Sequence, residues 1–164
     1  MIKLIVFDVD GTLTDGGIII SDGGIETKCF SDADGLIIRQ LPALGYVTAI
    51  ITGRISSPVE VRARDLRITK LYHGIGDKVV ALRELCGELG IRFAAVAYIG
   101  NDLNDYAAMD LCGWKACPAD AVEEIKAICD YISKLNGGRG AVRDILAKLL
   151  KSENRYADFV KLFG

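Results

Sequence analysis

Two aspartates separated by one residue, Asp8 and Asp10, stand where the first apolar run of the chain ends. That run, residues 2–7, is short, rich in Ile and closed by Gly11, a pattern typical of a buried strand in a parallel sheet. Side chains alternate along a strand, which predicts that the two carboxylates point the same way. Two like charges so close need a divalent cation between them or a raised pKa. Because all the ligand atoms are oxygens, we expect Mg²⁺.

More polar residues follow the later apolar runs or open the helices between them. In an open α/β sheet the carboxyl ends of the strands lie at one edge, where ligands bind. Phosphoryl transfer needs a nucleophile, a metal, a cation that neutralises the phosphoryl oxygens and a proton donor, and this set supplies one of each. The set consists of Thr52 after residues 46–51, Lys78 at the start of a helix over 78–89, and Asn101, Asp102 and Asp105 after residues 94–99.

Strand and helix patterns alternate along the chain, which predicts an α/β fold with a doubly wound parallel sheet in a single domain, residues 1–164. Asp22-Gly23-Gly24 lies between two short β runs and predicts a hairpin over 16–30. A glycine-rich loop opens a C-terminal helical tail over 136–164. Further strands are expected at 70–72, 114–116 and near 131, and helices at 35–44, 57–66 with Ser57 as N-cap, from 121, 141–151 and 156–163.

Composition excludes several classes of protein. The 164 residues are 51% hydrophobic, with 20 basic and 22 acidic side chains and a net charge of −2. There is no basic stripe for nucleic acid or an anionic membrane, and no apolar run of about 18 residues. The first strand begins within two residues of Met1, so we expect no signal peptide and a cytoplasmic protein. Five cysteines without a C-x-x-C pair predict reduced, mostly buried thiols.

The order and spacing of these residues resemble the four motifs of the haloacid dehalogenase superfamily of phosphatases. The motifs stand here as Asp8-Val9-Asp10-Gly11-Thr12, Thr52, Lys78 and Gly100-Asn101-Asp102-Leu103-Asn104-Asp105. The resemblance implies the Rossmann-like fold of that superfamily. It makes Asp8 the nucleophile that becomes an aspartyl-phosphate, and Asp10 the acid that protonates the leaving group and later activates water.

The resemblance also implies roles for the other motif residues. Thr52, the backbone at Gly53 and Lys78 would bind the phosphoryl oxygens, and Mg²⁺ would bind the Asp8 carboxylate, the Asp10 carbonyl and a fourth-motif side chain. Many relatives have aspartate where this chain has Asn101, which costs the site one negative charge. We rank Asn101 first as metal ligand and Asp102 next, with Asp105 as a partner of Lys78 or of a metal-bound water.

The gaps between the motifs leave no room for a cap domain. A site without a cap is open unless another subunit closes it, so we expect a homotetramer built through the 16–30 hairpin; the alternative is a flap within one subunit. Around Thr14-Asp15-Gly16, Asp34-Gly35 and residues 137–143 the chain is similar to the capless phosphatases that act on a small phosphorylated sugar acid, 3-deoxy-D-manno-octulosonate 8-phosphate.

Four arginines could bind the carboxylate or phosphate of such a substrate. Arg54 and Arg139 are the substrate-binding candidates, whereas we expect Arg62 and Arg143 to be surface residues. Two alternatives remain open, since related capless domains differ in activity. One is a phosphatase for a nonulosonic acid 9-phosphate or another phosphate ester, and the other is a non-catalytic oligomerisation module.

Overall fold

A six-stranded parallel sheet forms the centre of the protein. The computed structural model describes all residues, 1–164. Its strand order is β5-β4-β1-β6-β7-β8, with β1 at the switch point between strands reached in opposite directions. The prediction of a doubly wound α/β sheet is therefore confirmed. The strands are β1 (Leu4–Phe7), β4 (Val47–Ile51), β5 (Lys70–Tyr72), β6 (Val96–Ile99), β7 (Trp114–Cys117) and β8 (Tyr131–Ile132).

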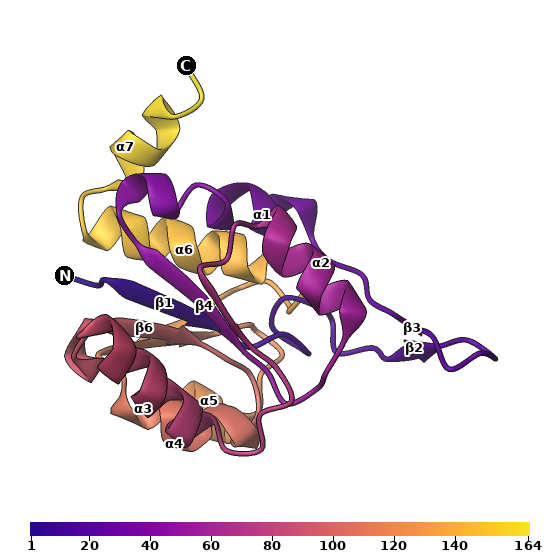
Figure 1. The fold of residues 1–164 in the computed structure, drawn as a ribbon. Coiled ribbons are helices and arrows are strands. Elements are labelled where there is room, and N and C mark those ends of the chain that lie inside the picture. Colours follow the sequence, from indigo (N-terminus) through magenta and orange to yellow (C-terminus); the bar gives the residue numbers. More distant parts are fainter.

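Helices cover both faces of the sheet (Figure 1). One layer holds α1 (Asp32–Ile38), α2 (Ser57–Asp65) and α6 (Ala141–Ser152), and α7 (Tyr156–Lys161) extends beyond it. The other layer holds α3 (Lys78–Leu89), α4 (Leu103–Leu111) and α5 (Glu123–Ile128). No helix combines the length and the apolar character that crossing a membrane requires.

Alternation along β1 divides its side chains between two cores. Ile5 and Phe7 pack in the core on the α1 and α6 face, and Leu4 and Val6 pack in the core on the α3 and α4 face. All four are fully buried. If the alternation continues by one step, Asp8 belongs to the α3 and α4 face, where it can meet side chains from the starts of those helices.

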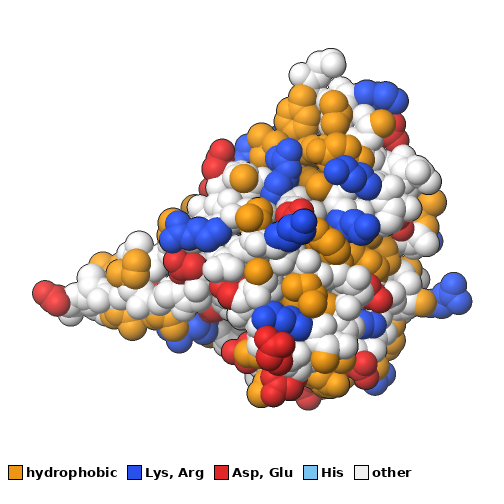
Figure 2. All heavy atoms as spheres, turned by 180° about the vertical axis from the view of Figure 1, so that it is seen from behind, with side chains coloured by type: hydrophobic (Ala, Val, Ile, Leu, Met, Phe, Trp, Pro, Cys, Tyr) orange, Lys and Arg blue, Asp and Glu red, His pale blue; other side chains and the backbone are white.

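A two-stranded hairpin leaves the body of the protein just after β1. Its strands β2 (Ile19–Ile20) and β3 (Glu26–Thr27) pair antiparallel, and the arm projects into solvent (Figures 1 and 2). Hydrophobic side chains are visible along the arm in Figure 2. The prediction of a hairpin insertion and no cap domain is confirmed.

Three predicted boundaries are wrong for local reasons. The helix expected over 35–44 begins at Asp32 and ends at Ile38, and Pro42, which has no N–H to donate, begins a separate 3-10 turn over Pro42–Leu44. The strand expected from residue 94 begins at Val96, after a 3-10 turn over Phe93–Ala95. The N-cap of α2 is Ser56, which places Ser57 inside the helix.

Candidate active site

Asp8 lies directly after the central strand and is buried. Its backbone N–H donates to Ile99 O at 3.0 Å, which continues the pairing of β1 with β6 by one residue. Its carboxylate Oδ1 accepts a hydrogen bond from Lys78 Nζ at 2.7 Å, and only 6% of the side chain is exposed. The carboxylate therefore lies on the α3 and α4 face, as the alternation of β1 predicts.

Lys78 reaches Asp8 from the first turn of α3. The N-cap of that helix is Asp77, whose carboxylate accepts hydrogen bonds from Val79 N at 2.9 Å and Val80 N at 3.2 Å, so the helix start is fixed. The Lys78 ammonium also donates to Asp105 Oδ1 at 2.6 Å. A lysine with 3% of its side chain exposed thus has two carboxylate partners.

Asp105 is held in place by three more donors. Tyr98 Oη donates to its Oδ1 at 3.0 Å, and the backbone N–H groups of Asn101 and Asp102 donate to its Oδ2 at 3.1 Å and 3.5 Å. The side chain is completely buried. Asp105 therefore positions Lys78 and the loop before α4, which agrees with the predicted contact between Asp105 and Lys78.

The electrostatics of this group raise the affinity of Asp8 for a proton when no cation is bound. Burial, and next to it the neighbouring Asp105 carboxylate, raises the pKa of Asp8 from 3.8 to about 7, against the opposing effect of Lys78. Burial alone would lower the pKa of Lys78, but Asp8 and Asp105 together raise it above its ordinary value. Lys78 is therefore a permanent cation, and the group carries an excess of carboxylates that a metal ion could balance.

Asp10 has a different environment from Asp8. The chain turns after Val9, whose carbonyl accepts hydrogen bonds from the backbone N–H groups of Thr12, Leu13 and Thr14. The strand alternation consequently stops before Asp10, so the pleat of β1 does not set the direction of its carboxylate. The Asp10 carboxylate is bound instead by the Lys28 ammonium, which comes from the hairpin.

The side-chain amide of Asn101 lies beside two oxygens of the aspartate pair, one from the Asp8 carboxylate and one from the Asp10 backbone carbonyl. The outer amide atom of Asn101 lies 3.1 Å from Asp8 Oδ2, 3.1 Å from the Asp10 carbonyl oxygen and 3.1 Å from Thr12 Oγ1. If that atom is oxygen, it forms a triangle with Asp8 Oδ2 and Asp10 O. Neighbouring ligands in an Mg²⁺ octahedron with bonds of 2.0–2.1 Å are about 3.0 Å apart, so the two distances from the Asn101 atom fit Mg²⁺.

The same amide also fits the site without a cation. Rotated by 180°, the Asn101 nitrogen donates to Asp8 Oδ2 and to the Asp10 carbonyl. Gly11, at φ +91°, makes the close approach possible, since a Cβ there would lie 2.2 Å from Asn101 Nδ2. The amide can therefore present either an oxygen to a metal or a nitrogen to the two oxygens.

Thr52 and the two residues that follow it extend the site along the edge of the sheet. Thr52 is buried at the end of β4, and its hydroxyl forms no hydrogen bond within the chain, which leaves it free to donate to a ligand. Gly53 continues the turn, and Arg54 Nε donates to Glu26 Oε1 at 3.3 Å. The side chains of Asp8, Thr52 and Asn101 thus follow the ends of the adjacent strands β1, β4 and β6.

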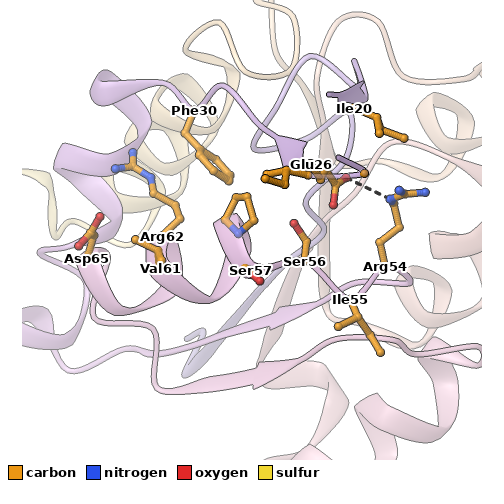
Figure 3. Close-up of a pocket in the computed structure, with 13 residues that line it drawn as sticks. Ile20, Glu26, Phe30, Arg54, Ile55, Ser56, Ser57, Val61, Arg62 and Asp65 are labelled. Atoms are coloured by element: carbon orange, nitrogen blue, oxygen red, sulfur yellow. Dashed lines mark hydrogen bonds and ion pairs between the residues drawn. The ribbon is translucent and has the colours of Figure 1, made fainter. Parts of the chain in front are cut away.

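A groove of about 990 Å³ lies between the hairpin and α2. Arg54 and Arg62 are among its lining residues (Figure 3). Arg62 Nη2 donates to Ser31 O at 2.8 Å, and the guanidinium lies 5.5 Å from the centre of the Phe30 ring. Arg62 lies at the surface as expected, but it is half-buried and these two contacts hold its side chain between the hairpin and α2.

Two predicted site residues do not join this cluster. The Asp102 carboxylate caps α4 by accepting from Leu103 N at 2.7 Å and contacts neither Asp8 nor Asp10, so local capping takes the side chain that we ranked second as a metal ligand. Arg139 forms an exposed ion pair with Asp15 at 3.3 Å, on the outside of the loop that follows the aspartate pair.

Sequence reasoning missed four residues that contact the site. Lys28 and Glu26 stand two apart on β3 and the residues after it, and this spacing in a hairpin inserted beside the aspartates is a signal that they share a face. Tyr98, which bonds Asp105, gave no such signal because it lies in a continuous apolar run. Thr12, which bonds Asn101, belongs to the first motif but was given no role.

Fold and site together define a capless, doubly wound α/β protein with a buried carboxylate at the carboxyl end of its central strand. Residues 64–146 match the family described as haloacid dehalogenase-like hydrolase. The chain belongs to this family, and the expectation of a phosphatase of the superfamily is confirmed.

Curated relatives and solved structures narrow the resemblance. The 3-deoxy-D-manno-octulosonate 8-phosphate phosphatases of Escherichia coli and Yersinia pestis are each 40% identical to the chain over 154 residues, which is 94% of this chain and 82% of theirs. The crystal structure of the Moraxella catarrhalis enzyme, with magnesium ion, phosphate ion and KDO bound, is 42% identical. It has a TM-score of 0.95 and covers 99% of this chain and 94% of its own. A cobalt-bound structure from Haemophilus influenzae is 33% identical, with a TM-score of 0.90 over 94% of this chain and 91% of its own.

Proposed function

We propose that this protein is an Mg²⁺-dependent phosphatase that hydrolyses 3-deoxy-D-manno-octulosonate 8-phosphate. The observation that carries the proposal is the buried group Asp8–Lys78–Asp105 beside three converging oxygens of Asp8, Asp10 and Asn101. The identity to phosphatases of that substrate over nearly the whole chain supports the choice of sugar acid. The magnesium, phosphate and KDO in the Moraxella structure support the choice of cofactor and ligands.

The first half of the reaction breaks the phosphate ester. An oxygen of the Asp8 carboxylate attacks phosphorus, the bond from phosphorus to the sugar oxygen breaks, and Asp10 gives its proton to the departing alkoxide. Lys78 donates a hydrogen bond to the Asp8 carboxylate and neutralises negative charge on the phosphoryl group during its transfer. The free hydroxyl of Thr52 and the backbone of Gly53 hold the remaining phosphoryl oxygens. Bound Mg²⁺ supplies positive charge that allows the anionic carboxylate and the anionic phosphate to meet.

The second half regenerates the free enzyme. Asp10, now a carboxylate, takes a proton from water, and the resulting nucleophile attacks the phosphorus of the Asp8 acyl phosphate. Inorganic phosphate leaves and the Asp8 carboxylate is restored. The first step needs Asp8 ionised on entry, which a bound cation and Lys78 favour over the protonated form that burial alone would produce.

The sugar acid end of the substrate would lie toward the groove between the hairpin and α2. Arg54 stands two residues after Thr52, and its two terminal nitrogens make no hydrogen bond in the structure. A guanidinium with free terminal donors suits a carboxylate such as that of a 2-keto acid. Arg139 is a further candidate for the substrate, after release from Asp15.

We also propose that the protein is a homotetramer assembled through the 16–30 hairpin. The support is the exposure of the arm's isoleucines: Ile18, Ile19, Ile20 and Ile25 are 46%, 59%, 61% and 69% exposed. Apolar side chains gathered on a projecting arm favour burial against another protein surface.

A steady-state screen with Mg²⁺ tests the proposed reaction. Purified protein is expected to release phosphate from 3-deoxy-D-manno-octulosonate 8-phosphate with a higher kcat/KM than from nonulosonic acid 9-phosphates or phosphopeptides. Asp8→Asn and chelation by EDTA should each reduce turnover by at least about 10³-fold, since they remove the nucleophile or the cation.

Two results would contradict the proposal. Unchanged turnover in Asp8→Asn would exclude the aspartyl-phosphate route. A preference for the 9-phosphates or phosphopeptides would leave the reaction class in place and exclude the named substrate.

A further inference from the structure

Lys28 is a completely buried cation on an otherwise exposed arm. Its side chain has 0% exposure, although its neighbours in sequence, Thr27 and Cys29, are exposed. The Lys28 ammonium binds Asp10 Oδ1 and lies 2.9 Å from Glu26 Oε1. A buried ammonium is stable only if its charge is paired, and here both partners are carboxylates.

The two aspartates of the site therefore have equivalent supports. Asp8 shares Lys78 with Asp105, and Asp10 shares Lys28 with Glu26. In each group one lysine joins a carboxylate with a proposed role in the reaction to a second carboxylate that fixes the lysine.

No other side chain of the protein forms a hydrogen bond with the Asp10 carboxylate. Lys28 occupies its Oδ1, while Oδ2 forms no hydrogen bond in the structure and remains available to the reacting groups. A short carboxylate side chain held at one oxygen presents the other oxygen in a defined direction.

Glu26 extends this contact to the groove. Its Oε1 also accepts from Arg54 Nε at 3.3 Å, as the dashed line in Figure 3 marks. The pKa of Glu26 is held below its ordinary value, by Lys28 first and by Arg54 to a smaller extent, so Glu26 stays ionised as the anchor. Charges alternate in sign along Asp10, Lys28, Glu26 and Arg54.

We propose that Lys28 is a positioning residue that fixes the Asp10 carboxylate for proton transfer to the leaving group, with Glu26 as its anchor. The inference rests on the proposed chemistry of Asp8 and Asp10. It places a determinant of catalysis on the hairpin, outside the motifs of the sheet edge.

Substrates with different leaving groups separate this role from a structural one. A sugar alkoxide needs a proton to leave, whereas p-nitrophenolate leaves as a stable anion. In Lys28→Met, which keeps the length and removes the charge, kcat/KM for the sugar acid phosphate should fall about ten- to a hundredfold, as expected for a misplaced catalytic group. kcat/KM for p-nitrophenyl phosphate should fall less than about threefold, because kcat/KM covers only the steps through departure of the leaving group and p-nitrophenolate needs no proton from Asp10.

Matched variants complete the experiment. Lys28→Arg should restore most of the lost kcat/KM, because arginine can still donate to Asp10. Lys70→Met removes a lysine that pairs with Glu88 away from the site, and it should leave kcat/KM unchanged for both substrates. If Lys28→Met fails to fold by circular dichroism, Glu26→Gln, which weakens the anchor, should show the same discrimination between leaving groups to a smaller extent.

Equal losses for both substrates, or no loss for either, would overturn the inference. Crystal structures of the wild type and Lys28→Met give a second readout that needs no activity. A displaced or disordered Asp10 carboxylate supports the inference, and an unmoved one contradicts it. A wild type that hydrolyses neither substrate would refute the proposed function, while the crystallographic comparison would still decide the role of Lys28.

Discussion

Asn101 shows how one side chain can serve two states of the site. Its outer amide atom lies 3.1 Å from both Asp8 Oδ2 and the Asp10 carbonyl, as oxygen for a cation or as nitrogen for a hydrogen bond. An aspartate there would add a full negative charge to a metal ligand but could offer no N–H to the other two oxygens. We therefore expect the amide to bind a metal more weakly than an aspartate would, and to stabilise the metal-free site.

Asn101→Asp is expected to bind Mg²⁺ about tenfold more tightly, because the added charge attracts the cation in a partly buried site. Isothermal titration calorimetry measures the dissociation constant. The metal-free variant should also melt at a lower temperature than the metal-free wild type. Asn104→Asp adds the same charge at an exposed position of α4 and serves as the control; equal Mg²⁺ affinities of the two variants would contradict the expectation.

The raised pKa of Asp8 makes the metal-free protein sensitive to pH. The folded state binds the Asp8 proton more tightly than the unfolded state, so the free energy of unfolding decreases as pH rises from about 4 to about 7. In Asp8→Asn this decrease is absent. In EDTA, the melting temperature of Asp8→Asn minus that of the wild type should therefore grow over this range.

Thermal denaturation between pH 4 and 8 measures this difference. Asp22→Asn, at an exposed position in the hairpin turn, provides the comparison for a carboxylate outside the site. A difference in melting temperature between Asp8→Asn and the wild type that stays the same at every pH would contradict the expected linkage.

At the scale of elements, the ends of three adjacent strands and the starts of two helices assemble the site. β1, β4 and β6 end in Asp8, Thr52 and the loop at Asn101, and the first turns of α3 and α4 add Lys78 and Asp105. The hairpin contributes Lys28 from outside this framework. The arm therefore combines a contact with the site and an apolar surface.

A double change, Ile19→Ser with Ile25→Ser, tests the role of the hairpin in assembly. Removing two exposed apolar side chains of the arm should shift the protein from tetramer to smaller species, because less apolar surface is buried between subunits. Light scattering coupled to size-exclusion chromatography measures the mass. Val160→Ser changes an exposed apolar residue of α7 and should leave the mass unchanged; a tetramer that survives the double change would contradict the proposal.

Local signals explain which elements the sequence could predict. The helix over 78–89 begins at Lys78 as predicted, and the structure shows Asp77 as its N-cap, which is a strong local signal for a helix start. The prediction extended the first helix past Pro42, because periodic apolar positions on either side of the proline masked the break. The sequence allowed Asp102 to be either a metal ligand or a helix cap. The local backbone decides between them, because it places the Asp102 carboxylate on Leu103 N.

At the scale of the whole molecule, the glycine-rich loop near the C-terminus packs against the loop that follows the aspartate pair. Gly138 N donates to Thr12 O at 3.2 Å. A Cβ on Gly137 would lie 1.9 Å from Gly11 O, so backbone approaches backbone with no space for a side chain. The tail is thereby coupled to the turn that holds Asp10.

Gly137→Ala is expected to destabilise the protein by about 1–3 kcal/mol and to lower turnover, because the added methyl group displaces the turn that contains Gly11. Gly87→Ala is the matched control, since no atom lies within 4 Å of the added carbon and alanine stabilises a helix by about 0.4–1 kcal/mol. Denaturant unfolding measures both effects. Equal stabilities of the two variants would show that the loop does not pack as described.

Long-range contacts explain what the sequence left undetermined. The pair Lys28 and Asp10 depends on how the hairpin folds back over the sheet edge, and the enclosure of Arg62 depends on the same arm. Neither orientation follows from periodicity. The motif residues were predictable because parallel strands necessarily end at one edge, whichever helices connect them.

All the charged groups assigned to phosphoryl transfer lie between residues 8 and 105, whereas α6, which completes one of the two cores, begins only at Ala141. A nascent chain leaving the ribosome would hold its full set of reacting side chains while about a third of its core residues were still missing. We expect such a chain to be inactive, because the packing that buries Asp8 and fixes the position of the Lys78 side chain is still absent.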